Sequence, residues 1–221
     1  ISLSHNGVLF LDELPEFKRS ALEVMRQPME ERRIIISRAK LTVDFPAGFM
    51  LIASMNPCPC GFFNHPKRDC TCPPGTVKRY LSKISGPLLD RIDLQVEVTP
   101  VPLEKLTGKN EETETSAIIA ERVVAARKIQ ANRYEGQTNI YNNAQMPSRL
   151  VRKWCVIDEK GTELLKQAME KLQMSARAYD RILKVSRTIA DLEGAEDILP
   201  RHLAEAINFR NLDREGWGEQ R

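Results

Sequence analysis

The sequence predicts an α/β domain over residues 1–110, followed by an all-helical domain over residues 111–221. In the first part, two short apolar runs at 8–11 and 49–53 are each followed by polar residues. Runs of this length suit buried strands of a parallel sheet, with the polar residues at their carboxyl ends. Beyond residue 115 no strand pattern dominates, and helices are expected instead.

The first domain is predicted to alternate strands with helices. After the strand at 8–12, residues 18–31 have helical spacing, with Pro28 disturbing the last turn. Residues 33–45 contain two strand-like segments joined by a polar tip at 37–40, which predicts a β-hairpin. The further elements expected are a strand at 49–53, a cysteine-rich loop at 58–72, a helix at 77–84, a helical turn at 88–91 and a strand at 94–98.

The second domain is predicted to follow a linker. Pro100, Pro102 and the polar stretch 108–115 are typical of such a connection. Residues 136–144, rich in Asn and Gln, are expected to form a surface loop. Helices are expected at 115–133, 147–154, 159–173, 175–193 and 200–210.

The composition describes a globular chain without a strong charge bias. Lys and Arg number 33 and Asp and Glu 30, so the net charge of +3 is too small to indicate nucleic acid by itself. No apolar run could cross a bilayer and no signal peptide is found, so we expect a cytoplasmic protein without a membrane partner. Four of the five cysteines lie within 58–72, which in that compartment favours metal or reduced thiols over disulfides.

Asp12 and Glu13 follow directly after the first apolar run. An adjacent Asp-Glu pair at the carboxyl end of a strand is what nucleotide hydrolysis requires, and it is the pattern of a Walker B motif. We expect Asp12 to hold Mg²⁺ and Glu13 to orient and deprotonate the water that attacks the γ-phosphate of ATP. The alternative is a core strand that ends in two solvated acids.

Asn56 follows the second run and has a side chain suited to a neighbouring role. Its amide can hydrogen-bond the γ-phosphate and the attacking water without adding charge. The alternative is an Asn that caps a turn before Pro57.

The other half of a nucleotide site is missing from these residues. No G-x-x-x-x-G-K-S/T loop occurs among the 221 residues, and the chain opens at Ile1, shortly before the first strand. We therefore expect the C-terminal part of a longer protein, divided between its two nucleotide-binding motifs. On its own this part should not hydrolyse ATP.

Three segments, 7–13, 54–61 and 85–94, resemble the magnesium-chelatase-like AAA+ ATPases, and among them the ComM or YifB type. The resemblance covers nearly the whole chain. It implies the C-terminal half of an AAA+ P-loop NTPase domain followed by an all-α lid domain. ATP and Mg²⁺ are the cofactors that it implies, and a ring of identical subunits, most simply a hexamer, is the implied assembly.

The resemblance also assigns roles to single residues. Asn56 matches the sensor 1 position. Arg91 matches the arginine finger, which a neighbouring subunit offers to the γ-phosphate. Arg177 matches the sensor 2 arginine at the start of a lid helix, and Arg181, one turn further on the same face, is the alternative.

The predicted hairpin resembles the pre-sensor 1 insertion of this AAA+ branch. Relatives that handle DNA use such hairpins to contact it in the pore of the ring. Arg38 and Lys40 near the tip suit contact with phosphates. An ordinary solvated turn is the alternative.

Cys58, Cys60, Cys70 and Cys72 form a C-x-C…C-x-C pattern with nine residues between the pairs. Four thiolates suit tetrahedral Zn²⁺ or an iron–sulfur cluster, although paired zinc ligands usually have two residues between them. The surrounding loop is rich in proline and has few apolar residues, which favours a structural zinc. His65 is a possible substitute ligand, and free or redox-labile thiols are the alternative.

Together these observations predict part of an ATP-hydrolysing ring motor that remodels DNA. The resemblance implies a branch-migration helicase of natural transformation. Two alternatives remain: the ATPase subunit of a chelatase that inserts metal into a porphyrin, and a non-catalytic binding module held together by zinc.

Overall fold

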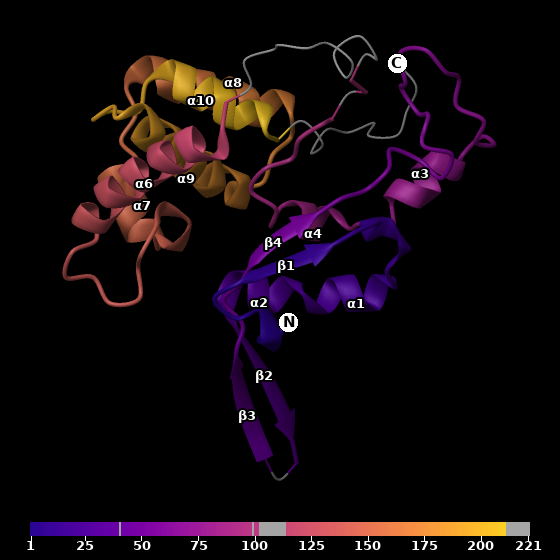
Figure 1. Ribbon diagram of the computed structural model, residues 1–221, viewed down its shortest axis with the longest axis horizontal. Helices are drawn as coiled ribbons and strands as arrows, with labels where there is room; N and C mark the ends of the chain where they lie inside the picture. The colour runs from indigo at the N-terminus through magenta and orange to yellow at the C-terminus, as the bar shows by residue number, and fades with distance from the viewer. Residues whose placement is uncertain (40, 99, 102–113, 211–221) are drawn as a thin grey trace. The chain divides into compact units, whose positions relative to one another are not determined.

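The computed structural model describes residues 1–221 except 40, 99, 102–113 and 211–221. Its described residues form two compact units, one over 1–92 and the other over 93–210 (Figure 1). The first unit is mixed α/β and the second is helical. None of the described helices combines the length and the apolar character that a membrane span requires.

The sheet of the first unit is a parallel pair of strands. β1 (Val8–Leu11) pairs with β4 (Met50–Ala53), so the parallel arrangement predicted from the two apolar runs is confirmed. One face packs on a core that includes Leu22, Leu88 and Leu14. The expected burial on both faces is wrong, because no described element covers the other face and four of its side chains are exposed: Val8, Phe10, Met50 and Ile52.

Two short helices replace the single helix predicted after β1. They are α1 (Arg19–Val24) and α2 (Arg26–Glu31), separated at Met25. Pro28 explains the break, since it has no N–H to donate to the carbonyl of Val24, four residues earlier. Proline therefore interrupts the segment before its last turn, earlier than expected.

The predicted hairpin is confirmed. β2 (Arg33–Arg38) pairs antiparallel with β3 (Leu41–Pro46), with Arg38 opposite Leu41. In Figure 1 the hairpin extends away from the β1–β4 pair. Its side chains are mostly exposed, including several apolar ones: Ile35, Ile36, Leu41 and Phe45.

The base of the hairpin is fastened to the residues that precede β1. The Ala47 N–H donates to the Arg32 carbonyl at 2.8 Å. Gly48 donates its N–H to Nδ1 of His5 at 3.0 Å, and its carbonyl accepts from the Asn6 N–H at 2.6 Å. A Cβ on Gly48 would lie 2.9 Å from the Arg32 guanidinium, so glycine allows this close approach.

Two short helices close the first unit. α3 (Thr76–Leu81) and α4 (Gly86–Leu89) correspond to the predicted helix and helical turn. Ser85 caps α4 by accepting from the Leu88 N–H at 3.3 Å. The predicted strand at 94–98 is wrong: these residues pair with no described strand, and their apolar side chains Leu94, Val96 and Val98 are exposed.

The second unit contains all five predicted helices. They are α6 (Ser116–Arg133), α7 (Ser148–Trp154), α8 (Glu159–Lys171), α9 (Ala176–Glu193) and α10 (Pro200–Asn208). α9 is central, since it contacts α6, α7 and α10. Cys155 is buried in this core. Side-chain caps from Thr115, Asp158 and Ser175 begin α6, α8 and α9.

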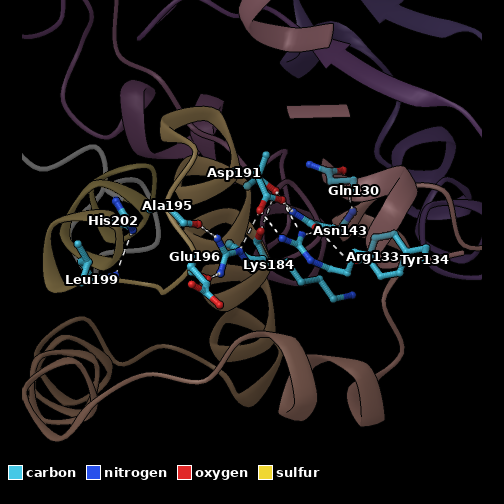
Figure 2. A network of polar contacts seen from close by, with 12 residues as sticks. Gln130, Arg133, Tyr134, Asn143, Lys184, Asp191, Ala195, Glu196, Leu199 and His202 are labelled. Carbon is cyan, nitrogen blue, oxygen red and sulfur yellow. Dashed lines mark hydrogen bonds and ion pairs between the residues drawn. The ribbon is translucent and has the colours of Figure 1, made fainter. Parts of the chain in front are cut away.

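A buried acid at the end of α9 joins three parts of this unit. The Asp191 carboxylate accepts from Arg133 of α6 at 2.6 Å, from Arg187 at 3.1 Å and from the Asn143 amide at 2.8 Å (Figure 2). Arg187 also donates to the carbonyls that follow α9, at Ala195 and Glu196, each at 2.6 Å. Because Asn143 is buried, the expectation of a surface loop at 136–144 is wrong at this residue.

We expect Asp191→Ala to lower the free energy of unfolding by about 3–5 kcal/mol, because two buried guanidinium groups lose their counter-charge. Urea unfolding followed by circular dichroism measures the change. Glu170→Ala on α8 removes an equal but exposed charge and should stay within about 0.5 kcal/mol of the parent. Equal effects of the two substitutions would contradict the structural role of Asp191.

Candidate functional site

The polar residues that follow β1 and β4 meet at one edge of the parallel pair. The Ser54 hydroxyl, just after β4, donates to Oδ1 of Asp12, just after β1. The same oxygen accepts the Glu13 N–H at 3.0 Å. The ladder continues past the strands, because the Ser54 N–H donates to the Leu11 carbonyl at 2.9 Å and the Leu14 N–H donates to the Ser54 carbonyl at 2.9 Å. Two loops distant in sequence are thus fixed to each other.

Asp12 is left with one oxygen available. Both of its hydrogen bonds reach Oδ1, and Oδ2 has no partner within the described part of the chain. The side chain is exposed. A carboxylate oriented through one oxygen and open at the other suits Mg²⁺ or a water molecule of its hydration shell.

Glu13 has a strained backbone. Its φ of 52° and ψ of 50° lie in the left-handed region, where a side chain costs about 1–2 kcal/mol. The conformation turns the chain from β1 into the short 3₁₀ turn Leu14–Glu16. Glycine or asparagine would make this turn at lower cost, so the glutamate points to a role for the carboxylate itself.

Asn56 lies two residues beyond Ser54 and is exposed. Tyr80 of α3 is a neighbour that the sequence did not reveal, because nothing in its local pattern distinguishes it from an ordinary core tyrosine. Burial raises the pKa of Tyr80, and the charges of Glu16 and Glu13 raise it further, while a hydrogen bond with the Asn56 backbone opposes them. α3 therefore lies beside both loops of the site.

Arg91 is buried within its own unit. Its side chain is only 6% exposed, its Nη2 lies 2.9 Å from Oε1 of Glu30, and its Nη1 donates to the Pro87 carbonyl at 2.6 Å. The guanidinium does not project from the unit in this conformation. The arginine-finger role stays a prediction, and it requires Arg91 to exchange Glu30 for a new partner.

Arg177 and Arg181 lie near the start of α9, as the sequence predicted. Ser175 caps this helix by accepting from the Ala178 N–H at 3.3 Å. Arg177 is exposed in the first turn, whereas Arg181 is largely buried and donates to the Asp93 carboxylate. The two candidates for sensor 2 thus differ, with Arg177 the more accessible and Arg181 held by an acid.

The four clustered cysteines come together. All four sulfurs lie within 4.8 Å of one another, with Cys58 at 3.3 Å from Cys60 and 3.7 Å from Cys70. Four sulfurs at about 2.3 Å from a tetrahedral Zn²⁺ would be about 3.8 Å apart. The donor set therefore fits a structural zinc ion despite the single-residue spacing. His65 is not part of the group, and its Nδ1 accepts the Lys67 N–H at 3.1 Å.

The clustered thiols differ in how readily they ionise. A backbone hydrogen bond from Phe62 lowers the pKa of Cys60 to about 5, so this thiol ionises readily. Burial raises the pKa of Cys72 to about 12, and a thiol of that kind needs a bound metal to lose its proton at neutral pH. The described cysteines form no disulfide.

One of the two basic residues predicted to contact DNA can be described. Arg38 ends β2, is exposed and forms no ion pair with a described residue. Lys40 lies outside the described residues. Elsewhere on the hairpin, Arg33 lies 3.4 Å from Asp44 and Ser37 lies 3.0 Å from Thr42.

Two family models match the chain. Residues 1–106 match the family described as magnesium chelatase, subunit ChlI, and residues 113–210 match the family of its C-terminal part. The chain is 47% identical over 214 residues to competence protein ComM of Haemophilus influenzae. It is 42% identical over the same length to the uncharacterized protein YifB of Salmonella typhimurium and of Escherichia coli. Each of these alignments covers 97% of this chain but 41% of the relative, so the chain spans less than half the length of these relatives.

We expect Cys70→Ser together with Cys72→Ser to release about one zinc ion per chain and to lower the melting temperature, because a structural zinc contributes directly to folding. Elemental analysis and thermal unfolding measure the two effects. Cys155→Ala removes a thiol outside the cluster and should leave the zinc content unchanged. A parent protein without zinc, with a melting curve that the double substitution does not alter, would exclude the metal site.

Proposed function

Because the chain belongs to the magnesium chelatase subunit ChlI family of AAA+ proteins, we propose that it supplies the water- and metal-handling half of an ATP-hydrolysing site. The observation that carries this proposal is the contact across the parallel strands. Ser54 donates to Asp12 and thereby holds the loop that contains Asn56 against the loop that contains Glu13. In open α/β sheets ligands bind at this carboxyl edge.

Asp12, Glu13 and Asn56 would each have a separate role in ATP hydrolysis at this edge. Oδ2 of Asp12 would hold Mg²⁺, directly or through water, and the ion would neutralise charge on the phosphates. Glu13 is exposed and carries an acceptor for the proton of an attacking water. The Asn56 amide adds a donor and an acceptor without charge, and so can orient a water beside a phosphate.

The remaining parts of the site would come from elsewhere. We propose that residues outside this chain cradle the phosphates and that Arg91 of a neighbouring subunit neutralises charge at the γ-phosphate, within a hexameric ring. Its present pairing with Glu30 would then be broken at the subunit interface. Arg177, the more exposed of the two arginines on α9, would respond to the bound nucleotide, with Arg181 as the alternative.

DNA is the substrate that we propose for the motor. The exposed hairpin with Arg38 near its tip supports this, because a projecting basic element can contact phosphates in the pore of a ring. The similarity to a protein named for competence supports it as well. Remodelling of branched DNA during transformation is the corresponding activity.

A second candidate is the ATPase subunit of a metal chelatase, which the family descriptions favour. The two functions share the same hydrolytic site and differ in what stimulates it. A DNA motor hydrolyses ATP faster when DNA is bound, whereas a chelatase subunit is indifferent to DNA.

We expect Glu13→Gln in the full-length protein to retain ATP binding and to lower turnover by roughly 10²–10⁴-fold, because the general base is lost while the metal and phosphate contacts remain. A steady-state ATPase assay and a fluorescent-nucleotide titration separate the two properties. Glu16→Gln, an exposed acid three residues away, serves as the control. Normal turnover of Glu13→Gln would show that the Walker B assignment is wrong.

We expect branched or single-stranded DNA to stimulate the ATPase of the full-length protein, and Arg38→Glu to abolish the stimulation while leaving the basal rate unchanged. The basal rate is retained because Arg38 lies on the hairpin, outside the hydrolytic edge. The rates with and without DNA are the measurement. Hydrolysis indifferent to DNA would favour the chelatase function, and no hydrolysis at all would favour a non-catalytic binding module.

A further inference from the structure

We propose that the second unit carries its own groove for single-stranded nucleic acid, separate from the hairpin. A groove of about 470 Å³ lies against the C-terminal half of α6 and the residues that follow it. Its lining combines two cations, two tyrosines, one amide and three apolar residues: Arg127, Lys128, Tyr134, Tyr141, Gln137, Val124, Ala131 and Ile140. This inference goes beyond the proposed ATPase, because it requires neither nucleotide nor ring.

The charge of the groove indicates an anionic ligand. Arg127 and Lys128 are exposed, and neither has an ion-pair partner among the residues that the structure describes. No carboxylate is present among the eight lining residues. Elsewhere on the same helix a cation is neutralised, since Arg122 binds Glu114 at 2.8 Å. The pair in the groove is therefore left to bind an external anion.

Aromatic surface lies beside the cations. Tyr141 is 65% exposed, so its ring is accessible to a ligand. Its backbone is held, because the Tyr141 N–H donates to the Gln145 side chain at 2.6 Å. An exposed ring on a held backbone, next to two cations, is a combination that binds single-stranded nucleic acid, with bases stacked on the ring and phosphates on the cations.

The floor of the groove is already formed without a ligand. Tyr134 is buried and its hydroxyl donates to Oδ1 of Asn143 at 2.7 Å. Asn143 in turn donates to Asp191, so the buried network of α9 fixes the position of this ring (Figure 2). A preformed surface loses less entropy on binding.

A strand fits this groove better than a free nucleotide does. Polyphosphates of nucleotides are usually bound by the free N–H groups at a helix N-terminus. The groove lies near the C-terminal end of α6, away from the start of the helix at Ser116. Backbone N–H groups near the C-terminal end donate to carbonyls within the helix. Separate cations are suited to phosphates that each carry one charge, as in a strand.

The test is fluorescence anisotropy of a fluorescein-labelled oligothymidine of about 20 nucleotides, titrated with the 221-residue chain at several salt concentrations and without ATP. We expect Arg127→Gln with Lys128→Gln to weaken binding roughly tenfold and to reduce the salt dependence of log K by about 1.4, or about 0.7 for each lost phosphate contact. Lys160→Gln with Lys166→Gln on α8 removes the same charge from an exposed surface and should change affinity less than about twofold.

Substitution of Tyr141 tests the contribution of base stacking separately from that of charge. Tyr141→Leu should weaken binding roughly 5- to 150-fold, the effect of losing one stacked base, without changing the salt dependence. Tyr141→Phe keeps the ring and should bind like the parent. If Tyr141→Leu also binds like the parent, no base stacks on Tyr141 and this part of the proposal is wrong.

Several results would overturn the proposed groove. Such results are no binding of oligothymidine by the chain, equal binding by the Arg127/Lys128 variant and its α8 control, and displacement of the oligonucleotide by ATP at equal nucleotide concentration. Full loss of binding in Arg38→Gln with no loss in the groove variants would also overturn it, while leaving a DNA-directed motor intact. Loss in the groove variants, together with an ATPase indifferent to DNA, would support the groove and count against the proposed motor.

Discussion

The parallel pairing of β1 with β4 is the constraint on which the first unit depends. Parallel neighbours cannot be joined by a tight turn, so the chain needs a long crossover between them. Here the crossover contains α1, α2 and the hairpin. The pairing also places Asp12 and Ser54 at the same edge, where their hydrogen bond links the two loops. The crossover between β1 and β4 therefore accounts both for the polar edge with Asp12 and Ser54 and for the projecting hairpin.

The second unit is organised by a buried charge as well as by its apolar core. Asp191 accepts hydrogen bonds from α6, from α9 itself and from the loop before α7. Because a buried ion needs all of its partners, the arrangement specifies one position for each of these segments. Nearby, burial lowers the pKa of Lys184, whose ammonium donates to the Ala144 carbonyl at 3.2 Å. Polar contacts thus extend from the helix ends into the loop that borders the proposed groove.

Patterns confined to neighbouring residues were readable from the sequence. The hairpin, the two short apolar strands, the five helices of the second unit and the gathering of four cysteines all follow from local spacing and were found. Contacts between residues far apart in the sequence could not be predicted in this way. The pairing of Arg91 with Glu30, the burial of Asn143 and the neighbourhood of Tyr80 each join segments far apart in the chain. The strand expected at 94–98 is wrong for the same reason, since an apolar run becomes a strand only when another strand lies beside it.

The hairpin is joined to the parallel strand pair by a very short connection. Only three residues separate the end of β3 at Pro46 from the start of β4 at Met50. One of them, Gly48, is hydrogen-bonded to His5 and Asn6, just ahead of β1. A force applied at the tip of the hairpin would therefore reach β4 through this connection and β1 through these hydrogen bonds. Movement of the hairpin relative to one strand alone would have to break these bonds, so the hairpin, the start of β1 and the start of β4 are held together.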